Sequence, residues 1–101
     1  MNYKIYTIDE IKVRFKKVAQ KYEIEEAYLF GSYARGEATK KSDVDFYVKT
    51  GELKSGWDLG GIWAETENAM KKKIDIVYAD EMVIDNEFEQ EMRKDLVKIY
   101  G

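Results

Sequence analysis

Residues 8–22 carry apolar side chains at the spacing of one face of an α-helix: Ile8, Ile11, Phe15, Val18 and Tyr22. This spacing places them together on the side of the helix that faces a core. Thr7 and Glu10 fit a capping box, in which each side chain binds the backbone N–H of the other residue. The pattern predicts an amphipathic helix over residues 8–22.

Shorter apolar segments have the pattern of β-strands. Residues 27–30 form an apolar run that ends at a glycine, as in a buried strand. Residues 43–49 alternate instead, which gives the strand an apolar face and a face with two carboxylates: Val44, Phe46 and Val48 against Asp43, Asp45 and Tyr47. Residues 74–78 predict a third strand, and residues 96–100 a short edge strand.

A second helix is predicted over residues 57–71, where side chains again follow the helical spacing: Leu59, Ile62, Trp63, Thr66 and Met70. The lysines at 71–73 suit the negative C-terminal end of this helix. Residues 85–95 predict a further helix. Trp57 and Trp63 are interpreted as core or helix-packing residues, with a partner-binding patch as the alternative.

The order of these elements predicts the fold. A helix separates the strands at 43–49 and 74–78, so these two should be parallel and joined by a right-handed crossover. The strands at 27–30 and 43–49 are joined too closely for a crossover and should be antiparallel. We expect an α/β (α+β) fold with a small mixed sheet, helices packed on one face and the other face open to a ligand. No linker or repeat divides the chain, so residues 1–101 are predicted to form one domain.

The composition narrows the chemistry. The chain has no cysteine and no histidine, which excludes disulfides, zinc–thiolate sites, cysteine nucleophiles and a histidine base. Any metal should be a hard cation held by oxygen atoms. The formal net charge of −3 gives no overall basic field for nucleic acid. No apolar run approaches the roughly 20 residues that span a bilayer, and the N-terminus lacks the pattern of a signal peptide, so we expect a cytoplasmic protein.

One segment, GSYARGEATKKSDVD, carries the candidate chemistry. Gly31 lets the backbone approach a ligand closely, and Ser32 offers a hydroxyl and a backbone N–H. Residues 33–35 are expected to form a single helical turn that ends at Gly36. Arg35 adds a charged fork suited to phosphate oxygens. The alternative for the turn alone is an ordinary strand-to-helix connection capped by serine.

Carboxylates follow this turn. Asp43 and Asp45 are two residues apart on a predicted strand, so their side chains project from the same face. Asp75 lies among apolar residues of the third strand, where burial without a partner is costly. If the two strands are neighbours, Asp75 can join the pair, and a divalent cation would relieve the repulsion between the carboxylates. A solvent-facing strand edge is the alternative for each of them alone.

Together these residues resemble the minimal nucleotidyltransferases (MNT) of the DNA polymerase β-like superfamily, whose signature is Gly-Ser, ten residues, then Asp-x-Asp. Gly31-Ser32 and Asp43-Val44-Asp45 have that spacing, and the segment 74–77 matches the strand of the third carboxylate. The resemblance implies a polymerase β-like fold and an enzyme of the nucleotidyltransferase class. It runs from about residue 8 to Tyr100.

The resemblance also implies a role for each residue. Asp43 and Asp45 would hold two magnesium ions that bridge the phosphates of ATP. Asp75 would bind the metal nearest the acceptor and help to deprotonate the attacking hydroxyl. A further set would hold the phosphates or support their surroundings: Gly31, Ser32, Arg35 and Ser42. The reaction is then in-line attack on the α-phosphate with pyrophosphate as the leaving group.

The acceptor is expected to come with another macromolecule, because larger relatives carry an acceptor-binding domain for which this chain has no room. Small proteins of this type resemble the MNT antitoxin of HEPN/MNT toxin–antitoxin systems, which transfers AMP from ATP to a tyrosine of a HEPN RNase toxin. The resemblance therefore implies a protein adenylyltransferase that neutralises a HEPN toxin. A non-catalytic antitoxin that acts by binding, and transfer to RNA or a small molecule, remain alternatives.

Overall fold

The computed structural model describes residues 4–52, 54–79 and 87–101. Its elements in chain order are α1 (Ile8–Lys21), β1 (Glu26–Phe30), α2 (Gly31–Arg35), β2 (Val44–Lys49), α3 (Gly56–Met70), β3 (Ile74–Tyr78), α4 (Glu87–Lys94) and β4 (Val97–Tyr100). These elements confirm the predicted helices and strands to within two residues at each end. The first two residues of the helix predicted over 85–95 lie outside the described residues.

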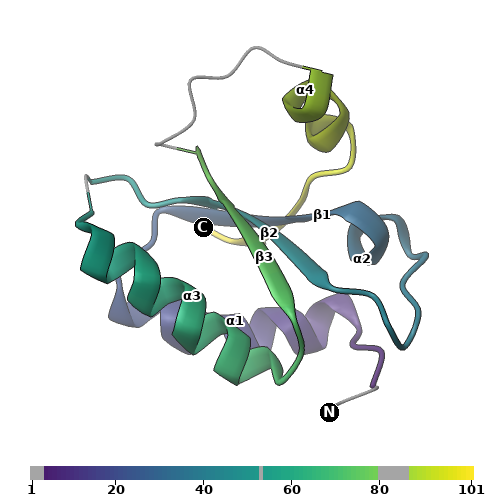
Figure 1. Cartoon of the computed structure of the whole chain (residues 1–101), viewed down its shortest axis with the longest axis horizontal. Helices are drawn as coiled ribbons and strands as arrows, with labels where there is room; N and C mark the ends of the chain where they lie inside the picture. Colours follow the sequence, from purple (N-terminus) through teal and green to yellow (C-terminus); the bar gives the residue numbers. More distant parts are fainter. Residues whose placement is uncertain (1–3, 53, 80–86) are drawn as a thin grey trace.

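The strands form a mixed sheet in the order β3-β2-β1-β4. β2 and β3 are parallel, and β1 is antiparallel to both β2 and β4. The predicted directions of the first three strands are therefore confirmed. α1 and α3 lie side by side on one face of the sheet, while α4 lies on the other side (Figure 1).

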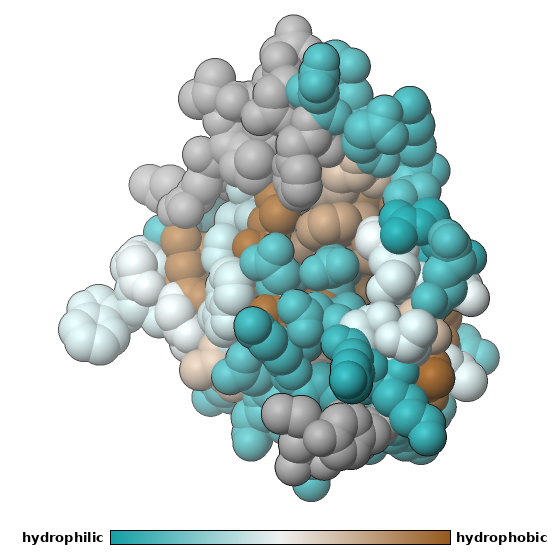
Figure 2. All heavy atoms as spheres, turned by 45° about the vertical axis from the view of Figure 1, so that its right-hand side comes forward, coloured by the Kyte–Doolittle hydropathy of each residue, from teal (hydrophilic) through white to brown (hydrophobic). Residues whose placement is uncertain are grey.

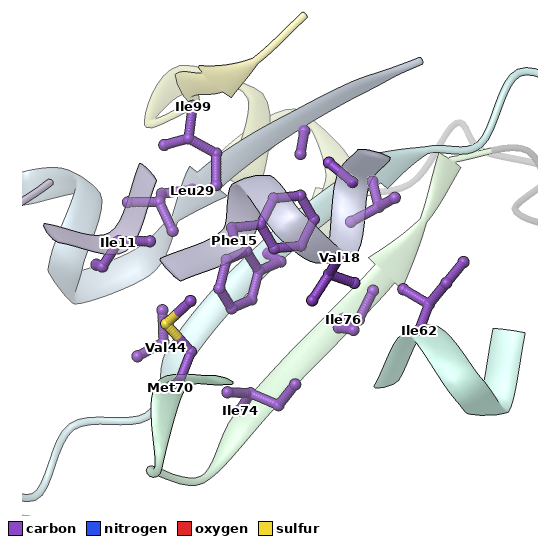
Figure 3. Close-up of a cluster of buried hydrophobic side chains, with 14 of the residues drawn as sticks. Ile11, Phe15, Val18, Leu29, Val44, Ile62, Met70, Ile74, Ile76 and Ile99 are labelled. Atoms are coloured by element: carbon purple, nitrogen blue, oxygen red, sulfur yellow. The ribbon is translucent and has the colours of Figure 1, made fainter. Parts of the chain in front are cut away.

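A hydrophobic core fills the space between the sheet and the α1–α3 layer. Phe15 of α1 stacks on Phe46 of β2 with ring centroids 5.2 Å apart, and both are fully buried. Figure 3 shows the apolar side chains of α1, α3 and the strands that point into this core: Ile11, Phe15, Val18, Leu29, Val44, Ile62, Met70, Ile74, Ile76 and Ile99. Each large side chain buried here contributes roughly 1.5–3 kcal/mol, so the core fixes the strands that carry the candidate site.

The prediction that the helices pack on one face and leave the other face open is only partly right, because α4 covers part of the second face. Met92 of α4 packs against Phe30 and Tyr47 in a second, smaller buried cluster. Asp45 and Asp75 project from the same side of the sheet as Tyr47, and Asp75 is exposed. The ligand-accessible part of this face is therefore the end of the sheet near the start of β2 and β3.

Hydrogen-bonded caps explain where the two long helices begin. In α1, Thr7 and Glu10 form the predicted capping box, with bonds of 3.1 and 3.0 Å. Ser55 and Asp58 form a second capping box at the start of α3. No helix in the described part of the chain is both long and apolar enough to cross a bilayer.

The interpretation of Trp57 as a packing residue is wrong, because its side chain is 92% exposed. Trp57 precedes the fully buried Thr66 by nine residues. At about 100° per residue, this separation puts it half a turn away from the buried face of α3. Trp63 does pack against the core, as expected.

Candidate active site

The turn from β1 into α2 brings the backbone against a carboxylate. Gly31 has φ of +72°, which favours glycine, and a Cβ at this position would overlap Oδ2 of Asp45. The antiparallel register pairs Phe30, the residue before the turn, directly with Asp45. The sequence therefore needs glycine at position 31 both for the backbone conformation and for the space beside Asp45.

Two of the predicted carboxylates lie side by side on neighbouring strands. The parallel register of β2 and β3 pairs Asp45 with Asp75. The pair before them in this register, Val44 and Ile74, is buried in the core and fixes the alignment of the strands. Asp43 is exposed and stands one residue before β2 begins, so it lies in the loop rather than at the start of the strand as predicted.

The charge of Asp45 is unfavourable where the fold places it. Its pKa is raised to about 6, mainly because burial disfavours the charged form and secondly because of the negative charges of Asp75 and Asp43. Arg35 acts in the opposite direction. Near neutral pH the carboxylate is still largely ionised, and a bound cation would relieve the cost of its charge. A pKa raised by burial and by neighbouring carboxylates is typical of functional sites.

The carboxylates of the candidate site do not by themselves form a complete metal-binding site among the described residues. In residues 4–52, 54–79 and 87–101, no three carboxylate, histidine or cysteine side chains are close enough to hold a metal ion by themselves. Mg²⁺, however, usually takes one or two carboxylates and completes its shell with phosphate oxygens and water. The Asp45–Asp75 pair offers only oxygen donors and a concentrated negative charge. It therefore fits a magnesium ion that is bound together with a nucleotide.

Arg35 is held at the edge of this site by two ion pairs. Its Nε donates to Glu37 Oε1 at 2.9 Å, and its Nη1 donates to Asp95 Oδ2 at 2.9 Å. Asp95 lies between α4 and β4, so this contact ties the C-terminal part of the chain to α2. The Arg35 side chain is 45% exposed, and its charge still lowers the pKa of Asp45. A phosphate group would have to compete with these carboxylates for Arg35.

Ser42 uses its hydroxyl to shape the loop before β2. Its Oγ accepts a hydrogen bond from the backbone N–H of Thr39 at 2.8 Å, and its own N–H donates to Thr39 O at 3.0 Å. These bonds close a turn that leads directly to Asp43. Figure 2, in which the right-hand side of Figure 1 is turned forward, shows hydrophilic side chains over much of this part of the surface.

Comparison with protein families decides the class of the molecule. The model of the polymerase beta nucleotidyltransferase domain matches residues 14–101. The chain belongs to this nucleotidyltransferase family. The match includes every residue of the predicted signature, and it confirms both the predicted resemblance and the enzyme class.

A relative from Methanocaldococcus jannaschii supports the same assignment. It is provisionally named a protein adenylyltransferase and is 39% identical to this nucleotidyltransferase over 70 residues, which cover 69% of this chain and 75% of the relative.

Solved structures share the fold of this nucleotidyltransferase. One is a toxin–antitoxin complex with AMP-PNP, matched with a TM-score of 0.73 at 18% identity, over 89% of this chain and 73% of that chain. Another is a tri-AMPylated Shewanella oneidensis HEPN toxin in complex with an MNT antitoxin, with a TM-score of 0.68 at 16% identity, over 93% and 72% of the two chains. At these identities the likeness shows the fold, and the predicted polymerase β-like architecture is confirmed.

The structure thus brings only part of the predicted constellation into contact. Gly31, Asp45 and Asp75 lie together, while Asp43 approaches from the loop. The roles of all these residues remain predictions. Sequence reasoning missed Asp95, which is 60 residues from Arg35 along the chain. No local pattern could have linked the two.

Proposed function

We propose that this nucleotidyltransferase is a magnesium-dependent protein adenylyltransferase that acts as an antitoxin. It transfers AMP from ATP to a tyrosine hydroxyl of a partner toxin of the HEPN class. The observation that carries the proposal is the position of Asp45, which lies between the Gly31 turn and Asp75 on the accessible part of the sheet. The name of the Methanocaldococcus jannaschii relative and the AMPylated toxin of the similar complex support this acceptor class.

In this proposal Asp43, Asp45 and Asp75 hold magnesium, with two ions expected. Bound magnesium would neutralise the triphosphate and the charge that develops at the α-phosphate. Asp45 provides a half-buried carboxylate whose charge has little other compensation. Asp75 is exposed, so the acceptor can reach it. Because the chain has no histidine, we assign the proton of the attacking hydroxyl to the Asp75 carboxylate.

The remaining signature residues are proposed to bind the triphosphate: Gly31, Ser32, Arg35 and Ser42. The glycine turn lets phosphate oxygens approach the backbone, and the Arg35 guanidinium can turn from Asp95 toward the β- and γ-phosphates. The tyrosine oxygen then forms a bond to the α-phosphorus, and the bond between the α-phosphorus and its bridging oxygen to the β-phosphate breaks. Pyrophosphate leaves with the electrons of that bond.

We further propose that residues 1–101 work as one domain and that the reaction takes place in the cytoplasm. One sheet, with a main core on one face and a smaller cluster on the other, joins the described elements from α1 to β4, which supports the single domain. The proposed reaction uses ATP and silences an RNase, and the cytoplasm is the compartment that contains both ATP and RNA.

The test measures transfer of label from α-labelled ATP to a purified toxin of the HEPN class. We expect wild-type protein to label the toxin at sub-stoichiometric amounts, and Asp45→Asn to reduce the rate by at least about 1,000-fold. Asp9→Asn removes a carboxylate from the exposed start of α1 and serves as the matched control. The catalytic proposal would be replaced by silencing through binding if two results were found together. Asp45→Asn would silence the toxin as well as wild type does, and both proteins would need stoichiometric amounts.

A further inference from the structure

Lys72 stands out because it is a charged residue inside the fold. It lies in the short connection between α3 and β3, and it is 8% exposed. Lysine is rarely buried unless a carboxylate pairs with it, because removing an ammonium group from water is costly. Here the ammonium group donates to two neutral main-chain oxygens, Lys4 O at 2.8 Å and Lys40 O at 3.3 Å. A buried charge held in this way calls for a specific reason.

The contacts of Lys72 join the loop that leads to the candidate site to two other segments of the chain. Lys40 belongs to the loop that leads to Asp43, and Lys4 to the segment before α1. The ammonium nitrogen also lies 5.9 Å from the ring centroid of Tyr33, a buried residue of α2. Lys72 itself precedes Asp75 by three residues, a chain length of at most about 10 Å.

Hydrogen bonds fix the chain on both sides of Lys72, at the end of α3 and at Lys73. Tyr6 donates its hydroxyl proton to Met70 O at 2.6 Å, and Arg14 Nη1 donates to Ala69 O at 2.9 Å. The backbone N–H of Val44 donates to Lys73 O at 3.2 Å, which extends the pairing of β2 with β3. Lys72 thus extends from this hydrogen-bonded connection to the more exposed loop of residues 37–43.

We propose that Lys72 is a positioning residue for nucleotidyl transfer. Its ammonium group holds the 37–43 loop and α2 against the start of β3, so that Asp43 keeps its place relative to the Asp45–Asp75 pair. The inference rests on the proposed function, since it assigns Lys72 a part in the same site.

The first experiment measures amide hydrogen exchange in the protein without nucleotide. Lys72→Met removes the charge and the donor but keeps the length of the side chain. Lys73→Met is the matched control, because it removes the same charge from the neighbouring exposed side chain. We expect the amides of residues 37–44 to exchange at least about 10-fold faster in Lys72→Met than in Lys73→Met, with equal rates in the middle of α1. If Lys72→Met does not fold, Lys72→Gln, which keeps an N–H donor, replaces it.

The second experiment separates positioning from general stability. We expect Lys72→Met to raise the KM for magnesium–ATP at least about five-fold and to change kcat by a smaller factor, whereas Lys73→Met leaves both near wild type. Equal exchange in the 37–44 segment of the two variants would overturn the inference, and so would faster exchange spread evenly over the whole chain. The exchange result does not depend on the acceptor. Failure of the wild-type protein to transfer AMP would therefore count against the proposed function and leave the exchange comparison intact.

Discussion

Two carboxylates of this nucleotidyltransferase occupy opposite electrostatic environments. Glu10, in the first turn of α1, has its pKa lowered to about 2, first by the hydrogen bond from Lys4 and then by the backbone N–H of Thr7. Asp45, at the start of β2, has its pKa raised to about 6 by burial and by Asp75 and Asp43. Glu10 is therefore satisfied by the fold that surrounds it, whereas Asp45 is not.

The difference separates a structural carboxylate from a candidate functional one. The fold surrounds Glu10 with donors, because an N-terminal helix turn has unpaired N–H groups. It places Asp45 close to two other carboxylates. On its other side lies Gly31, where no side chain would fit beside Asp45. A protein keeps such an unfavourable arrangement where a ligand resolves it.

Gly31→Ala should impair both AMP transfer and stability. The added Cβ would overlap the Asp45 carboxylate and also requires a positive φ. We expect AMP transfer to fall at least 100-fold and the free energy of unfolding to decrease by roughly 1–3 kcal/mol. Labelled-ATP assays and urea unfolding measure the two effects.

Gly36→Ala is the matched control for this prediction. Gly36 also has a positive φ, +74°, but a Cβ there meets no atom of the described residues within 4 Å. It should cost about 1 kcal/mol through backbone strain alone and retain most of the transfer activity. Similar activities for the two variants would show that the space beside Asp45 does not matter.

The sequence predicted the elements of the fold well because local patterns determine them. The alternation in residues 43–49, the apolar run before Gly31 and the capping box at Thr7 each agree with the structure. The Gly-Ser and Asp-x-Asp spacing also led to the correct family. These features depend on neighbours in the chain and on the periods of the helix and strand.

Contacts between distant residues could not be predicted in the same way. The contact of Arg35 with Asp95, and those of Lys72 with Lys4 and Lys40, depend on how separate segments of the chain pack. No spacing in the sequence indicates them. The three lysines at 71–73 looked alike as a helix end, yet Lys72 is buried and Lys73 exposed. Trp57 is apolar and lies next to the amphipathic stripe of α3, but its angle around the helix turns it to solvent.

Asp95→Asn should have a moderate effect, because it leaves Arg35 with one ionic partner, Glu37. If Asp95 competes with phosphate, the KM for ATP should fall about two- to five-fold, which matches the worth of a partly exposed ion pair. Steady-state kinetics at varied ATP tests this. A higher KM would mean instead that Asp95 holds Arg35 in the orientation that phosphate needs.

Asp45→Asn should change how stability depends on pH. Asp45 has a folded pKa raised from 3.8 to about 6, so between these values the folded state binds more protons than the unfolded state. Its contribution to stability is therefore present at pH 3.8 and below and is lost as the pH rises to about 6. Without metal, the Tm of Asp45→Asn relative to wild type should be higher at pH 7 than at pH 4. A difference that does not change with pH would contradict the raised pKa.

Glu10→Gln should show the opposite dependence and the smallest effect. Glu10 has a lowered folded pKa, so it stabilises the fold above its ordinary pKa of 4.5, and this stabilisation is lost as the pH falls toward 2. Because the carboxylate lies at the protein surface, we expect the Tm to fall by a few degrees at most at pH 7, with no difference near pH 2. Thermal melts at both pH values measure this change, and AMP transfer should stay at the wild-type rate. A loss of transfer in Glu10→Gln would mean that the start of α1 takes part in the reaction, and the contrast between the two carboxylates would no longer separate structure from function.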